Sequence, residues 1–262
     1  MLRLESISKA FNPGTVNETQ ALNQVSLSLL QGEFITVIGG NGSGKSTMLN
    51  SVAGVFPIDS GKIIVDGNDV TGLPDYKRAI YLGRVFQDPM LGTAGNMTIE
   101  ENLALALRRG NRRGLSQGVP KSERQQYKEA LALLDLGLEN RLTAQVGLLS
   151  GGQRQAITLL MATIKKPKLL LLDEHTAALD PKTAAKVLEL SDMLIKRDNL
   201  TALMVTHNMK DAIRYGDRLI MMNGGNIVFE AAGEEKRSLT VKDIIEKFST
   251  VSAGEFGTTL LG

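Results

Sequence analysis

The fold is decided by Gly39-Gly40-Asn41-Gly42-Ser43-Gly44-Lys45-Ser46, which directly follows the apolar run FITVI at residues 34–38. A short β-branched run of this kind is typical of a buried strand, and a helix can begin near Lys45 and end at Gly54. Glycines let backbone N–H groups converge on phosphate oxygens, because a Cβ would block that approach. The N-terminus of the following helix adds a partial positive charge. The stretch therefore predicts a phosphate-binding loop between a strand and a helix.

Two side chains of this loop carry most of its predicted chemistry. Lys45 suits the β- and γ-phosphates of a nucleotide, and the Ser46 hydroxyl suits Mg²⁺. A glycine-rich turn before a helix is the alternative, and the flanking strand and helix argue against it. The predicted nucleotide-binding residues of the loop are Gly39, Asn41, Gly42, Ser43, Gly44, Lys45, Ser46 and Thr47.

An acidic pair, Asp173 and Glu174, follows the apolar run LLLL at residues 169–172. Such a strand delivers its carboxylates at its carboxyl end, beside the phosphate-binding loop. We predict that Asp173 holds Mg²⁺ through water and that Glu174 orients and polarises the attacking water. An acidic turn at the surface would be the better interpretation only without the phosphate-binding loop. Together the two features predict a nucleoside triphosphatase.

The segment Leu149-Ser150-Gly151-Gly152-Gln153 narrows the class. With it, the sequence resembles the ATP-binding subunit of the ABC transporter family, from about residue 2 to about residue 248. The resemblance implies ATP and Mg²⁺ as cofactors and ATP hydrolysis as the activity.

The resemblance also assigns roles to motifs that would say little alone. Gln87 in VFQDP resembles the family's Q-loop, which senses Mg²⁺ and the attacking water, and residues 178–180 resemble its D-loop. His207 resembles the switch histidine that contacts the γ-phosphate; a satisfied histidine after a buried strand is the alternative. Phe11 lies where the family places an aromatic ring that stacks on adenine, although a phenylalanine after a strand is more often a core residue. The predicted catalytic residues are Glu174, His207 and Gln87, and the predicted metal-site residues are Ser46, Gln87 and Asp173.

Ser150, Gly151 and Gly152 open a helix, so they form a second anion site by the helix-terminus argument. With Gln153 they complete the predicted nucleotide-binding set. The resemblance implies that this site reaches the γ-phosphate bound by another copy, so that two ATP molecules lie in a head-to-tail, two-fold symmetric dimer. A helix N-cap followed by a flexible glycine pair is also a correct description, but an incomplete one.

Two features have no assigned role. His175 stands where many family members carry proline, and it either makes turnover pH-sensitive or is a tolerated loop substitution. The arginines at positions 108, 109, 112 and 113 form either a solvated face or a contact for anionic lipid headgroups or an acidic partner loop.

Composition excludes several other classes. The absence of cysteine rules out disulfides, thiol catalysis and iron–sulfur clusters, and two histidines rule out a multi-histidine metal site. A net charge of +2 gives no electrostatic case for nucleic acid. No apolar run reaches the roughly 18 residues of a membrane span, and the N-terminus lacks the apolar block of a secretory signal. We therefore expect a cytoplasmic chain whose membrane role comes through a partner.

Strands that alternate with helices predict an α/β fold with a mostly parallel sheet covered on both faces. We expect a P-loop NTPase (RecA-like) core, an antiparallel β subdomain and an inserted α-helical subdomain at about 88–165. The whole would be one ATP-binding domain, 1–250, followed by a flexible tail, 251–262. Capping boxes at residues 98–101 (TIEE) and 122–125 (SERQ) predict two helix starts in the insert.

The leading hypothesis is an ATPase subunit that powers a membrane transporter from the cytoplasmic face of the membrane, as a peripheral protein. The expected partners are a second copy, separate transmembrane permease subunits and, indirectly, a substrate-binding protein. Residues 173–183 resemble ATPases paired with amino-acid-type binding proteins, which makes a bacterial amino-acid importer the favoured case. The alternatives are a membrane-free ABC ATPase, such as the iron–sulfur assembly type, the ATPase subunit of an exporter, and, last, a P-loop kinase or GTPase.

Overall fold

The computed structural model describes residues 1–111 and 118–259, of which residues 251–259 are described by their backbone alone. The chain divides into two compact units. Unit 1 comprises Met1–Leu73 and Thr201–Gly262, and unit 2 comprises Pro74–Leu200. Each unit carries part of the predicted site, and each is described by itself.

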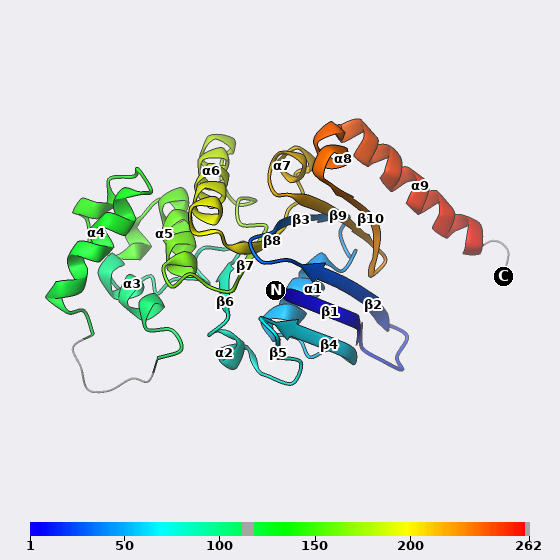
Figure 1. The fold of residues 1–262 in the computed structure, drawn as a ribbon, viewed down its shortest axis with the longest axis horizontal. Coiled ribbons are helices and arrows are strands. Elements are labelled where there is room, and N and C mark those ends of the chain that lie inside the picture. The colour runs from blue at the N-terminus through cyan, green and yellow to red at the C-terminus, as the bar shows by residue number, and fades with distance from the viewer. Residues whose placement is uncertain (112–117, 260–262) are drawn as a thin grey trace. The chain divides into compact units, whose positions relative to one another are not determined.

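Unit 1 contains the predicted antiparallel β subdomain. Its strands are β1 (Leu2–Phe11), β2 (Thr19–Leu29), β4 (Ser60–Val65) and β5 (Asn68–Asp69), in the order β2-β1-β4-β5 (Figure 1). Neighbouring strands run antiparallel, and in β1 the buried Leu2 and Leu4 alternate with the exposed Arg3. This period of two places one face of the sheet in the core, as the alternation of the sequence indicates.

A second sheet of unit 1 carries the phosphate-binding loop. Its strands β3 (Phe34–Gly39), β8 (Thr201–Val205), β9 (Arg218–Asn223) and β10 (Asn226–Ala232) lie in the order β10-β9-β3-β8. β3 pairs parallel with β8 and β9, and β9 returns through a tight turn to pair antiparallel with β10. Five successive residues of β3, from Phe34 to Ile38, are buried, which explains its continuous apolar sequence.

Helices cover this sheet. They are α1 (Lys45–Ala53), α7 (Met209–Arg214), α8 (Gly233–Ser238) and α9 (Val241–Thr259) (Figure 1). Ile244 of α9 packs with Ile38, Leu219 and Met221 in one buried cluster. The helix α9 extends to Thr259, and the flexibility expected of residues 251–262 stays a prediction. Residues 260–262 lie outside the described part of the chain.

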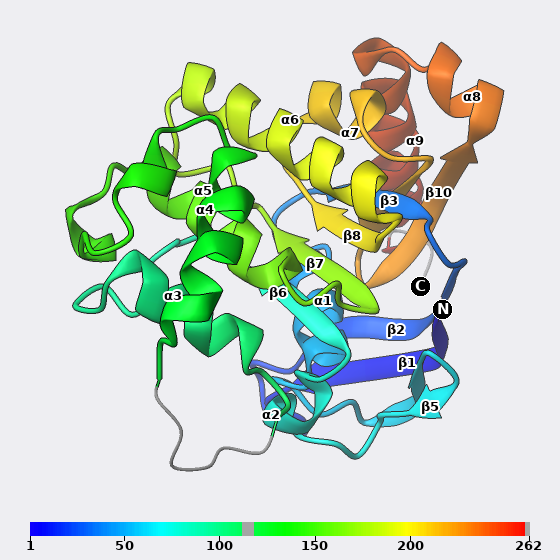
Figure 2. The ribbon, with the colours of Figure 1, turned by 60° about the vertical axis from the view of Figure 1, so that its left-hand side comes forward.

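Unit 2 combines a pair of parallel strands with most of the helical insert. The strands are β6 (Leu82–Val85) and β7 (Leu169–Asp173), and Figure 2 shows α3, α4 and α5 gathered on one side of them. Its helices are α2 (Asp75–Arg78), α3 (Ile99–Leu107), α4 (Arg124–Ala132), α5 (Gly151–Thr163) and α6 (Pro181–Asp198), with 3₁₀ turns at Lys121–Glu123, Leu138–Asn140 and Val146–Leu148.

One of the two predicted capping boxes is present. The Thr98 side chain accepts from the Glu101 N–H, and the Glu101 carboxylate accepts from the Thr98 N–H, at the start of α3. The box predicted at Ser122 is wrong: α4 begins at Arg124 with Glu123 as an N-cap that makes no side-chain cap. The Glu123 carboxylate instead accepts hydrogen bonds from Arg108 and Tyr127, and this contact fixes a 3₁₀ turn where the local pattern favours a cap.

Candidate functional site

Lys45 spans the predicted phosphate-binding loop in unit 1. Lys45 is 4 % exposed, and its Nζ donates to the carbonyl oxygens of Gly39 and Gly40, at 2.7 and 2.8 Å, and to Ser43 Oγ at 3.3 Å. These bonds hold the lysine across the loop, with Ser46 exposed beside it. These oxygen acceptors are of the kind that phosphate oxygens also offer to an ammonium group.

Gly44 shows why the loop needs glycine. It has φ +99° and serves as the N-cap of α1, and a Cβ at this position would overlap the carbonyl oxygen of Ala21. No side chain caps α1. The first turn of α1 is thus a place where the N–H groups and the helix dipole favour an anion.

His207 leaves the sheet at the same edge as the loop. β3 and β8 are parallel neighbours with Val37 opposite Val205, so the residues after both strands emerge together. His207 is exposed and precedes Asn208, whose side chain caps α7. Unit 1 therefore brings the predicted phosphate loop and switch histidine to one edge of its sheet.

Phe11 is half-buried at the end of β1. Its ring packs edge-to-face on Phe56, with centroids 5.4 Å apart, and Lys9 Nζ lies 5.7 Å from its centroid. The ring thus packs on another half-buried ring and has an exposed portion that a base could cover.

A second edge, in unit 2, carries the acidic pair and Gln87. β6 and β7 are parallel, with Val85 opposite Leu172, so Gln87 and the acidic pair follow their strands in the same direction. Gln87 and Asp173 line one cavity of about 380 Å³, together with Arg84, Phe86, Asp88, Leu91 and Ala178. Glu174 is half-buried and adopts a left-handed backbone conformation, with φ +45°. That conformation is rare for a residue with a Cβ and is typical of functional turns.

Arg84 and Gln155, which the sequence did not single out, both contact this edge. Arg84 Nη2 lies 3.1 Å from Asp173 Oδ2. The buried Gln155 of α5 donates to the carbonyl oxygen of Phe86 at 3.1 Å, which ties the residue before Gln87 to the helical insert. Neither contact has a local sequence signal, because the partners are far apart in the chain.

The LSGGQ segment begins α5 as predicted. Ser150 is the N-cap, and with Gln153 it forms a capping box with two bonds of 3.3 Å. A Cβ on Gly152 would overlap the Thr183 side chain of α6, so this glycine permits the close approach of the two helices. Asp180, in the predicted D-loop, caps α6 by accepting from the Thr183 N–H, and hydrogen bonds with Thr183 lower the pKa of its carboxyl group.

His175, which follows the acidic pair in the sequence, is buried. Its Nε2 lies 2.9 Å from Ser191 Oγ on α6, and burial lowers its pKa to about 4. The imidazole is therefore neutral at physiological pH. This supports a packing role for His175 over a role in making ATP turnover pH-sensitive.

Of the arginine cluster, Arg108 pairs with Glu123 at 3.0 Å, and burial lowers the pKa of Arg109. Arg112 and Arg113 lie outside the described residues.

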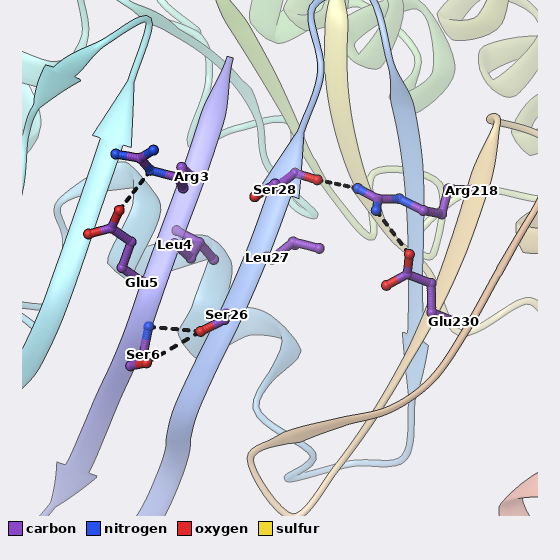
Figure 3. A pocket seen from close by; sticks show the side chains of 9 residues that line it. All are labelled: Arg3, Leu4, Glu5, Ser6, Ser26, Leu27, Ser28, Arg218 and Glu230. Carbon is purple, nitrogen blue, oxygen red and sulfur yellow. Dashed lines mark hydrogen bonds and ion pairs between the residues drawn. The ribbon is translucent and has the colours of Figure 1, made fainter.

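Another polar groove lies in unit 1 and has a structural use. It measures about 340 Å³ and is lined by residues of β1, β2, β9 and β10 (Figure 3). Arg218 spans it, donating to the Ser28 carbonyl and to Glu230, and pairing with Glu33 at 3.0 Å. The Arg218 guanidinium therefore links β9 to β2 and β10.

The family model described as ABC transporter matches residues 22–177, which contain the phosphate-binding loop, Gln87, the LSGGQ segment and the acidic pair. The chain belongs to the ABC transporter family. It is accordingly an ATP-binding ATPase with the predicted P-loop α/β fold. Among the described residues, no helix has both the length and the apolar character needed to span a membrane.

Curated relatives of this ABC ATPase include two kinds of transport protein. The chain is 45 % identical to a tyrosine transport ATP-binding protein of Clostridioides difficile, over 95 % of this chain and 98 % of the relative. It is 36 % identical to the spermidine/putrescine import ATP-binding protein PotA of Haemophilus influenzae, over 90 % of this chain and 59 % of the relative.

Solved ABC cassettes share the fold. A dimeric post-hydrolysis structure of the cassette MJ0796 with ADP and Pi has a TM-score of 0.75 and 31 % identity, covering 88 % of this chain and 98 % of that one. The ADP conformation of the cassette MJ1267 has a TM-score of 0.76 and 29 % identity, covering 95 % and 98 %.

Proposed function

We propose that this ATPase powers a bacterial importer for an amino acid, with tyrosine or a related aromatic amino acid as the first candidate. One observation carries the proposal: the relative that matches over 98 % of its own length is named for tyrosine transport. The longer polyamine relative matches over 59 % of its length, so it supports the transport role more than a substrate. The chain would act as a peripheral protein on the cytoplasmic face of the membrane, bound to separate permease subunits that a substrate-binding protein serves.

Nucleotide binding would begin at the loop in unit 1. The N–H groups at the start of α1 and the Lys45 ammonium would hold the β- and γ-phosphates, since Lys45 can exchange its carbonyl partners for phosphate oxygens. Phe11 would stack on the adenine, while Phe56 supports its ring from the side.

The residues present fit a magnesium ion. The exposed Ser46 hydroxyl, the Asp173 carboxylate and the Gln87 amide oxygen are hard oxygen donors, which Mg²⁺ prefers. Phosphate oxygens and water would supply the remaining ligands, because Mg²⁺ usually keeps several waters and binds through few protein groups. Bound there, Mg²⁺ would neutralise charge that develops on the phosphates.

Hydrolysis would use Glu174 and His207. The Glu174 carboxylate would accept a hydrogen bond from the attacking water and polarise it, and its left-handed backbone fixes the direction in which the side chain leaves the turn. His207 would donate to the γ-phosphate.

A second copy of the chain would complete each site. The first turn of α5 offers the N–H groups of Gly151 and Gly152 to an anion, with Ser150 already held in place by its capping box. We assign this surface to the γ-phosphate bound by the partner copy, in a head-to-tail dimer. The dimeric cassette MJ0796 supports this arrangement.

Gentle purification of the tagged chain from membranes tests the transport role. We expect a permease to co-purify with the chain. The receptor found in the complex, or encoded beside the permease gene, is then tested by calorimetry for binding of tyrosine, phenylalanine, tryptophan, methionine and spermidine. Micromolar or tighter binding of an aromatic amino acid supports the substrate. Co-purification with iron–sulfur assembly proteins, and with no membrane protein, would establish the membrane-free alternative instead.

A further inference from the structure

The Asp173 carboxylate, which we assign to Mg²⁺, forms an ion pair with Arg84. Arg84 on β6 and Asp173 at the end of β7 belong to neighbouring parallel strands, and Arg84 Nη2 lies 3.1 Å from Asp173 Oδ2. The two side chains are only 15 % and 16 % exposed, so water screens the pair weakly. Both line the cavity of about 380 Å³ that also contains Gln87.

The guanidinium of Arg84 has a second contact. Its centre lies 4.6 Å from the centroid of the Phe86 ring, within the range of a cation–π interaction. Arg84 could therefore leave the carboxylate and still keep a favourable place over the ring. The contact between Arg84 and Asp173 can therefore be exchanged, because the Phe86 ring holds the guanidinium independently of Asp173.

We infer that Arg84 is a resident counter-ion of Asp173 that competes with Mg²⁺ and makes metal binding conditional on nucleotide. A cation this close cancels most of the attraction of the carboxylate for a second cation. Mg²⁺ can enter only when nucleotide phosphates add enough further attraction to offset that repulsion. The inference rests on the proposed role of Asp173 as a metal-site residue.

The alternative role for Arg84 is to orient Asp173 for the metal. A guanidinium that stays on Oδ2 would aim Oδ1 at the metal, as outer partners of metal ligands often do. The two roles predict opposite results when the charge is removed. Competition predicts that Mg²⁺ binds more tightly without Arg84, and orientation predicts that it binds less tightly.

The test measures affinity for the non-hydrolysed analogue AMP-PNP by calorimetry, over a series of free Mg²⁺ concentrations, with the full-length chain. For Arg84→Met we expect half-maximal enhancement of AMP-PNP binding at about tenfold lower Mg²⁺ than for the wild type, the scale of one nearby charge. Arg84→Lys keeps the charge and should stay within about twofold of the wild type. In EDTA the variants and the wild type should bind AMP-PNP equally, which assigns the difference to the metal.

An equal or higher Mg²⁺ requirement in Arg84→Met would overturn the competition. Thermal unfolding checks the fold of each variant, and Arg84→Gln provides a second neutral substitution should the methionine variant fail to fold. If the wild type itself binds AMP-PNP without any Mg²⁺ dependence, the metal assignment of Asp173 fails and the inference falls with it. A Mg²⁺-dependent wild type with an unchanged Arg84→Met curve removes the inference alone.

Discussion

Replacing His175 by Gln should reduce the decrease in the free energy of unfolding that we expect as the pH falls into the mildly acidic range. His175 is 2 % exposed, and burial lowers its pKa to about 4, whereas an imidazole in an unfolded chain has a pKa of about 6.5. Protons therefore bind the unfolded chain more readily, and stability falls as pH drops. The contribution of the neutral imidazole is complete above about pH 6.5 and is lost progressively toward pH 4.

The size of the effect follows from the two pKa values. Their difference corresponds to about 3 kcal/mol at about 1.4 kcal/mol per pH unit. Domains are typically stable by only about 5–15 kcal/mol, so this single group should be a visible part of acid sensitivity. Glutamine does not titrate, and its terminal amide can still reach the Ser191 hydroxyl that His175 Nε2 contacts at 2.9 Å.

Urea unfolding, followed by circular dichroism between pH 7.5 and 4.5, measures the prediction. The free energy of unfolding of His175→Gln should fall less steeply than that of the wild type, while carboxylates titrate alike in both. His207→Gln removes the other histidine, which is exposed, and is the matched control for the substitution of a histidine by glutamine. A His175→Gln profile as steep as the wild type would refute the link between burial and acid sensitivity.

Three further predictions concern catalysis and assembly. Glu174→Gln should bind ATP with near wild-type affinity, lower the hydrolysis rate by about 10²–10⁴-fold, and accumulate a dimer visible by light scattering; a persistent wild-type rate would remove the residue from its role. Mixing Lys45→Ala and Ser150→Ala chains should restore hydrolysis above either parent, since each heterodimer regains one intact composite site, and no gain despite heterodimer formation counts against shared sites. Gly152→Ala should lower the midpoint of thermal unfolding by several degrees, because its Cβ overlaps Thr183, whereas Gly151→Ala, with its nearest contact at 3.4 Å, should shift the midpoint less; equal shifts would contradict the packing argument.

The chemistry of the site was readable from the sequence where it depends on residues adjacent in the chain. The phosphate-binding loop needs glycines, a lysine and a helix start within a few positions, so the local pattern specifies its conformation. The same holds for the capping boxes of α3 and α5, whose donors and acceptors lie three residues apart.

Local patterns failed where a distant side chain competes. The capping box expected at Ser122 is lost because Glu123 is bound by Arg108 and Tyr127. There a tertiary contact outweighs a preference worth about 1 kcal/mol.

The class of this protein could be predicted from the chain, because a phosphate-binding loop, an acidic pair after a buried strand and an LSGGQ helix start each consist of contiguous residues. The meetings between distant charges and polar groups became known from the fold: Arg84 with Asp173, 89 residues apart, His175 with Ser191, and Gln155 with the Phe86 carbonyl. Electrostatic pairing and burial depend on distance in space. Strand pairing and helix packing set that distance, and no spacing along the chain encodes it directly.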